Sequence, residues 1–145
     1  MSDRVEVMID RPAFPGEVEA VEKAFAGIDA DVIVGYEVRG AGDYPWIVFV
    51  TLTGITVTAF FRKLVDLAAE DAYAGLKRWA NTVADARRRY RKTSGTVDVR
   101  DAHISRIVLR VELPDEAFAL LLEMDLDALP DGAYLVWDGE GWKNV

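Results

Sequence analysis

Cysteine is absent from this 145-residue chain, and histidine occurs once, at His103. The lack of cysteine excludes disulfides, thiolate metal sites and cysteine nucleophiles. One histidine without cysteine also excludes the common zinc ligand sets. Carboxylates are plentiful, but their runs lack the ligand spacing of a calcium loop, so we expect no metal, and we expect no cofactor. The first residues include no basic leader followed by an unbroken apolar run, which favours a cytoplasmic protein over a secreted one.

Positively charged residues are scarce at both ends of the chain. The net charge is -8, but residues 1–57 carry -6, residues 58–110 carry +6 and residues 111–145 carry -8. The acidic total makes nucleic-acid binding an unfavoured function, because such binding depends on clustered Lys and Arg. The alternation of sign indicates that the segments neutralise one another in the fold or in an oligomer.

The order of periodic segments predicts a mixed fold in one domain covering residues 1–145. We expect strands over residues 5–9, 32–38, 96–100, 104–113 and 133–137, and helices over 17–28 and from Pro114. The first three elements form a strand–helix–strand unit with parallel strands. The whole favours an α+β, ferredoxin-like β-α-β…β-β-α-β sandwich with a long helical insertion over approximately residues 44–92.

Residues 44–61 contain eighteen positions and no charge. As a transmembrane helix this stretch reaches the lower length limit, and aromatic residues lie at both of its ends. Four threonines, Gly54 and Pro45 argue against that interpretation. We expect instead a buried strand over residues 46–52, followed by an amphipathic helix.

The apolar stripe of that helix is a candidate interface for a partner or a second copy. Its members recur at helical spacing: Phe61, Leu64, Val65, Leu76 and Trp79. A continuous helix over residues 58–92 would be about 50 Å long at 1.5 Å per residue. Because that length exceeds a domain of this size, we expect a break near residues 70–75 or a projecting helix.

A dense basic run ends the same helical pattern. The candidate anion contacts are Arg87, Arg88, Arg89, Arg91 and Lys92. The favoured interpretation is a set of solvated cations stabilised by the negative end of the helix dipole. The alternative is contact with phosphates of nucleic acid or of lipid headgroups.

Asp101, His103 and Ser105 alternate and would share one face of a strand. A Ser-His-Asp triad is instead built from distant positions whose side chains point at one another. We therefore interpret these three as a solvated hairpin face and predict no catalytic residue.

The pattern as a whole favours a non-enzymatic accessory or protein-interaction domain of bacterial type, bound to a partner protein or to a second copy of itself. One alternative is a module that binds an anionic surface, membrane or nucleic acid, through the basic run. Another is a carboxylate-dependent enzyme whose site the sequence does not reveal.

Overall fold

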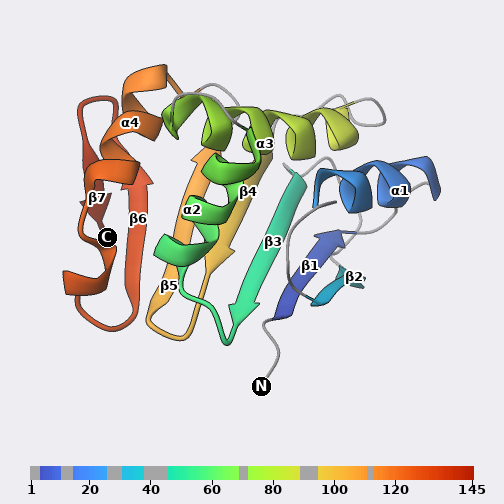
Figure 1. The fold of residues 1–145 in the computed structure, drawn as a ribbon, viewed down its shortest axis with the longest axis horizontal. Helices are drawn as coiled ribbons and strands as arrows, with labels where there is room; N and C mark the ends of the chain where they lie inside the picture. Colours follow the sequence, from blue (N-terminus) through green and yellow to red (C-terminus); the bar gives the residue numbers. More distant parts are fainter. Residues whose placement is uncertain are drawn as a thin grey trace.

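A computed structural model of the chain describes residues 4–10, 15–25, 31–37, 46–68, 72–88, 95–110 and 113–145. These residues form seven strands and four α-helices (Figure 1). The strands are β1 (Arg4–Asp10), β2 (Asp31–Glu37), β3 (Trp46–Thr53), β4 (Gly95–Arg100), β5 (Ile104–Arg110), β6 (Ala133–Trp137) and β7 (Trp142–Asn144). The helices are α1 (Pro15–Ala24), α2 (Val57–Ala68), α3 (Ala72–Arg88) and α4 (Asp115–Glu123), with a short 3-10 turn, η1 (Leu126–Ala128).

All seven strands form one mixed sheet in the order β2-β1-β3-β4-β5-β6-β7. Parallel and antiparallel neighbours alternate across it. The three parallel pairs are β1 with β2, β3 with β4, and β5 with β6, and helices connect the two strands of each pair. Such connections are required because parallel neighbours cannot be joined by a tight hairpin. The predicted parallel pairing of the first unit is confirmed.

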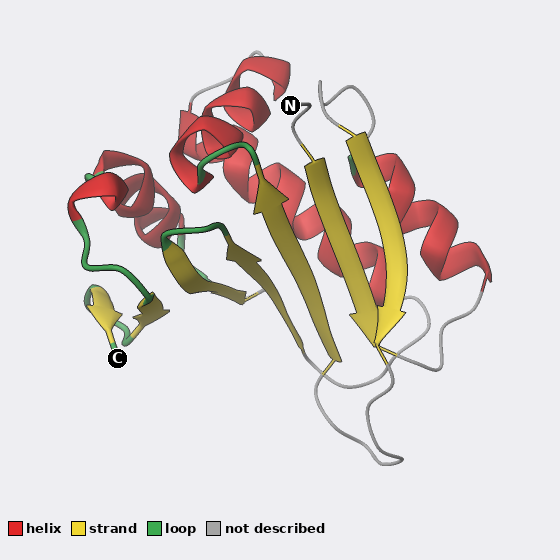
Figure 2. Ribbon diagram, turned by 90° about the horizontal axis from the view of Figure 1, so that it is seen from below, coloured by secondary structure: helices red, strands yellow, loops and turns green. Residues whose placement is uncertain are grey.

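The helices lie together on one side of the sheet (Figures 1 and 2). The core follows from the alternation of the strands, because every second side chain points at the helices. On β1 these are Val5, Val7 and Ile9, each fully buried. The opposite face, here called the bare face, has no described helix over it. It includes Glu6 and Met8 of β1, Phe49 and Thr51 of β3, Asp98 and Arg100 of β4, Arg106 and Val108 of β5, and Tyr134 and Val136 of β6.

The predicted break in the long helical pattern is confirmed, since α2 ends at Ala68 and α3 begins at Ala72. A sharp turn precedes α2, where Gly54 adopts a positive φ of 77°. Glycine suits this conformation because it has no Cβ to clash. The Thr56 hydroxyl then accepts a hydrogen bond from the Ala59 amide at 3.1 Å. Such a contact satisfies one of the free amides at a helix start.

The ferredoxin-like arrangement is not confirmed, because the sheet has seven strands in a different order. Residues 46–53 do not belong to an insertion beside the sheet. They form β3, which pairs with β1 on one side and with β4 on the other. Helices α2 and α3 are consequently the connection between two neighbouring parallel strands.

The uncharged stretch therefore contains a strand and the beginning of a helix, as the second interpretation of it predicted. Val48 and Val50 of β3, and Val57 and Phe60 of α2, are completely buried. Tyr44 and Pro45 lie outside the described residues. Among the helices that the structure describes, none is both long enough and apolar enough to cross a membrane.

Candidate functional site

The centre of the bare face holds a buried ion pair between neighbouring strands. Asp98 of β4 is only 1% exposed, and its Oδ2 accepts hydrogen bonds from the guanidinium of Arg106 on β5. Burial raises the pKa of Asp98 above its ordinary value and outweighs the lowering by the Arg106 charge. The other oxygen, Oδ1, has no hydrogen bond of standard geometry to a described group, although the nearby Thr96 hydroxyl favours the ionised form.

Two arginines flank the Phe49 ring beside this pair. The Cζ atoms of Arg100 and Arg106 lie 5.5 and 5.6 Å from the ring centroid. Arg106 also lies 5.2 Å from the ring centroid of Tyr134. At such distances a guanidinium is attracted to the negative face of the ring. We call Phe49, Asp98, Arg100, Arg106 and Tyr134 the sheet-face cluster.

Strand register explains why the cluster forms. Phe49 is opposite Asp98, and Arg106 is opposite Tyr134, so four side chains of the cluster stand on adjacent strands of one face. Arg100 is opposite Thr51, whose hydroxyl accepts a hydrogen bond from Arg100 Nε at 2.7 Å. These hydrogen bonds hold both guanidiniums beside the Phe49 ring. A partner that binds them would therefore remove little additional side-chain entropy.

Positive charge dominates this part of the bare face. Arg106 is neutralised by Asp98, whereas Arg100 and Arg110 are exposed and make no ion pair with any described residue. A guanidinium presents parallel N–H groups that match the two oxygens of a carboxylate. The arrangement is therefore suited to bind carboxylates beside an aromatic surface.

The sheet-face cluster is not among the sites predicted from the sequence. A signal for it exists, because Asp98 and Arg100 alternate with the buried Val97 and Val99. That alternation indicates a strand with one polar face. The sequence does not indicate that the polar face carries a paired carboxylate and an aromatic ring, because the partners come from β3, β5 and β6.

Most of the candidate interface residues in the long helical pattern are buried and do not form a surface stripe. Phe61, Leu64, Leu76 and Trp79 are at most 6% exposed and belong to the hydrophobic core. Val65 is half-buried. The first four are covered almost completely by this chain's own sheet and helices, so they do not form an exposed stripe for a partner protein.

The basic run falls mostly outside the described residues. Arg87 and Arg88 form the end of α3, and Arg89, Arg91 and Lys92 follow it in the part that the structure does not describe. No side-chain contact can be assigned to the run, so it stays a prediction.

The three alternating residues of the β4–β5 turn do not form a triad. Asp101 accepts hydrogen bonds from the amides of Val57, His103 and Ile104, at 2.8, 2.7 and 2.6 Å, and so ties the turn to the start of α2. The Ser105 hydroxyl shares its proton between the carbonyl oxygens of Gly132 and Ala133, at 2.8 and 2.9 Å, rather than donating it to the histidine. His103 Nδ1 contacts the carboxylate of Asp131.

The contact between His103 and Asp131 predicts a pH dependence of stability. The hydrogen bond to Asp131 raises the pKa of His103 above its ordinary value of 6.5, against a smaller opposing effect of burial. A raised pKa in the folded state means that the stabilisation is complete below about pH 6.5 and is lost as the pH rises through the higher folded value. We expect His103→Gln to lower the melting temperature at pH 5.5 and to have a smaller effect at pH 8. A loss that is equal at both pH values, measured by thermal unfolding, would contradict this assignment.

No group of three or more histidine, aspartate or glutamate side chains is placed to hold a metal ion within the described ranges. Comparison of the chain with protein-family models, curated proteins and solved structures finds no match.

Proposed function

We propose that this chain is a non-enzymatic protein-interaction domain that binds an acidic segment of a partner protein on the bare face of its sheet. The sheet-face cluster is the observation that carries the proposal. Arginine and aromatic residues contribute most of the binding energy at many protein interfaces, and Arg100 and Arg106 flank Phe49 at the centre of this face.

Charge complementarity selects the partner. Arg100 and Arg110 place positive charge on a face of a protein whose net charge is -8. The partner surface that complements this face carries carboxylates near apolar side chains, because the half-buried rings of Phe49 and Tyr134 stand on the strands at either side of the arginines.

Two other occupants fit this face less well. Two copies packed face to face would bring arginine-bearing surfaces together, and like charges at an interface oppose association. A nucleic acid needs many clustered Lys and Arg, because counterion release grows with the number of phosphates neutralised, and this part of the face offers Arg100 and Arg110 as its exposed cations.

Peptide binding tests the proposal directly. The probe is a short synthetic peptide of alternating glutamate and phenylalanine, with the lysine–phenylalanine peptide as its charge-reversed control. Arg100→Glu replaces an exposed guanidinium with a carboxylate. We therefore expect calorimetry to show that this variant binds the glutamate peptide at least about tenfold more weakly than the unmodified chain does.

Arg78→Glu is the matched control, because it makes the same charge change at an exposed position of α3, on the helical side. We expect it to bind the glutamate peptide as the unmodified chain does. If both substitutions weakened peptide binding equally, the effect would come from net charge and not from the bare face, which would contradict the proposal. Tighter binding of the lysine peptide, or of an oligodeoxythymidine, would overturn the proposal.

A further inference from the structure

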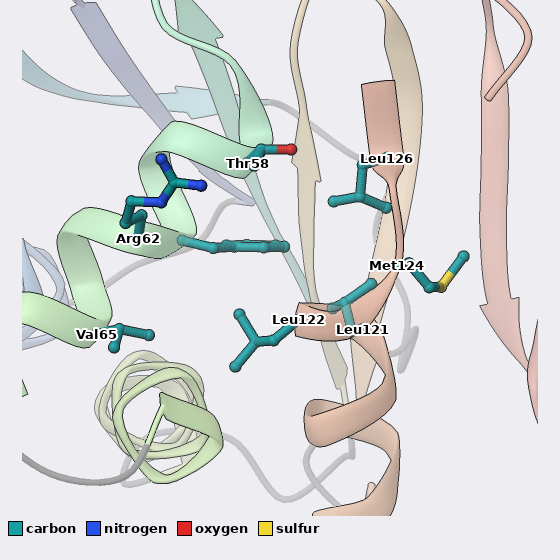
Figure 3. Close-up of a pocket in the computed structure, with 8 residues that line it drawn as sticks. Thr58, Arg62, Val65, Leu121, Leu122, Met124 and Leu126 are labelled. Carbon is teal, nitrogen blue, oxygen red and sulfur yellow. The ribbon is translucent and has the colours of Figure 1, made fainter. Parts of the chain in front are cut away.

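A groove of about 180 Å³ lies on the helical side of the molecule, away from the bare face (Figure 3). One wall comes from α2, where Thr58, Phe61, Arg62 and Val65 follow one another at helical spacing. Residues three, four and seven apart share one face of a helix, so these four side chains form a continuous wall.

The facing wall comes from α4 and the segment after it, through Leu121, Leu122, Met124 and Leu126. Leu121 and Leu126 are buried, and Leu122 and Met124 are half-buried. The groove thus has a buried apolar floor and a partly exposed apolar rim. Its α2 wall carries two polar groups, the Thr58 hydroxyl and the Arg62 guanidinium.

Both polar groups lack a partner within the described part of the chain. Thr58 Oγ1 is buried and makes no hydrogen bond there. Because this atom has almost no accessible surface, a ligand in the groove reaches it only after a rotation of the Thr58 side chain. Arg62 is exposed, lies one turn further along α2, and makes no ion pair with a described residue. Figure 3 shows the Thr58 hydroxyl directed toward Leu126 and the Arg62 guanidinium apart from it, farther from Leu126.

We infer that this groove binds a small apolar carboxylic acid, with the apolar part between α2 and α4 and the carboxylate at Arg62. The size fits such a ligand, because a protein cavity of about 150 Å³ accommodates one benzene molecule. The charge fits as well, since Arg62 is the charged residue among those that line the groove. This site is separate from the sheet-face cluster, so the inference does not depend on the proposed function.

Acidic side chains stand nearby and define the competing outcome. Glu123, Asp125 and Asp127 are exposed along α4 and η1, but they do not line the groove. If their charge determined selectivity, the groove would prefer a cationic amphiphile to an anionic one.

Three probes of equal chain length separate these outcomes: hexanoate, hexan-1-ol and hexylamine. We expect saturation-transfer NMR on the full chain to show hexanoate binding about tenfold more tightly than hexan-1-ol, the difference reflecting a charge-assisted hydrogen bond. Arg62→Gln should remove this preference and leave hexan-1-ol binding unchanged. Val65→Trp fills the rim and should weaken both ligands.

Arg110→Gln is the control, because it removes an exposed guanidinium from the bare face without touching the groove. The melting temperature of each variant establishes that the fold is retained. The inference is overturned if hexanoate does not bind the unmodified chain, if Arg62→Gln leaves the preference intact, or if hexylamine binds most tightly. None of these results bears on peptide binding at the sheet-face cluster.

Discussion

Arg106→Met is expected to lower the free energy of unfolding by about 3–5 kcal/mol at pH 7, because it leaves the carboxyl of Asp98 buried without its cation. Asp98 is 1% exposed and Arg106 supplies the hydrogen bonds to its Oδ2. Removing one member of a buried pair costs more than removing both, since the remaining charge is neither solvated nor neutralised. Chemical denaturation monitored by fluorescence measures the loss.

The pH dependence of that loss has a definite sign. Burial already raises the pKa of Asp98, and removal of Arg106 eliminates the largest opposing effect. A carboxyl with a raised folded pKa favours the folded state at low pH and loses that contribution as the pH rises through the folded value. The deficit of Arg106→Met should therefore shrink toward pH 4.

Two variants control this experiment. The double variant Asp98→Leu with Arg106→Met removes both charges and should recover most of the lost stability. Arg110→Met changes an exposed arginine on the same strand, and surface changes of this kind usually stay within about 0.5 kcal/mol. A double variant as unstable as Arg106→Met alone would show that the pair is not the source of the effect.

Trp79→Ala is expected to cost about 3–5 kcal/mol of unfolding free energy and to leave the oligomeric state unchanged. Trp79 is 6% exposed and makes edge-on contacts with Phe25 and Phe60, with ring centroids 5.6 and 5.4 Å away. It thus connects α3 with α2 and with the end of α1. Denaturation measures the stability, and sedimentation measures the association state.

Trp79→Phe is the matched control for that substitution. It keeps an aromatic ring and removes the indole Nε1, which is buried and has no hydrogen-bond partner in the described part of the chain. We expect a loss below about 1.5 kcal/mol, because the smaller ring gives up contacts while one unpaired donor disappears. If Trp79→Ala dissociated an oligomer without lowering stability, Trp79 would be an interface residue and its place in the core would be contradicted.

The existence of most elements could be predicted from the sequence because their periods are local. Val5, Val7 and Ile9 alternate, and the charge-free stretch before Arg62 contains the residues of a buried strand. Sheet order could not be predicted in the same way. Residues 46–53 pair with β1 and β4 through long-range contacts. Such contacts do not change the alternation of apolar and polar residues within a strand, so the sequence of each strand does not indicate its neighbours.

The same limit explains the candidate sites. An amphipathic stripe such as the one containing Leu64 and Trp79 indicates that a helix face is covered. It does not indicate whether the chain's own core or a partner protein covers that face. Here the chain's own sheet and helices cover it. The bare face results from the placement of all the described helices on one side of the sheet, which leaves Arg100 and Phe49 on the other side.

The measurement that tests the central claim most directly is two-dimensional NMR of the isotope-labelled chain during titration with the glutamate–phenylalanine peptide. The account predicts that the Nε–Hε signals of Arg100 and Arg106 shift with the amides of Phe49 and Tyr134, while α2 and α3 are unaffected. Shifts confined to the helices, with the arginine signals unchanged at saturation, would contradict the assignment of the bare face as the binding surface.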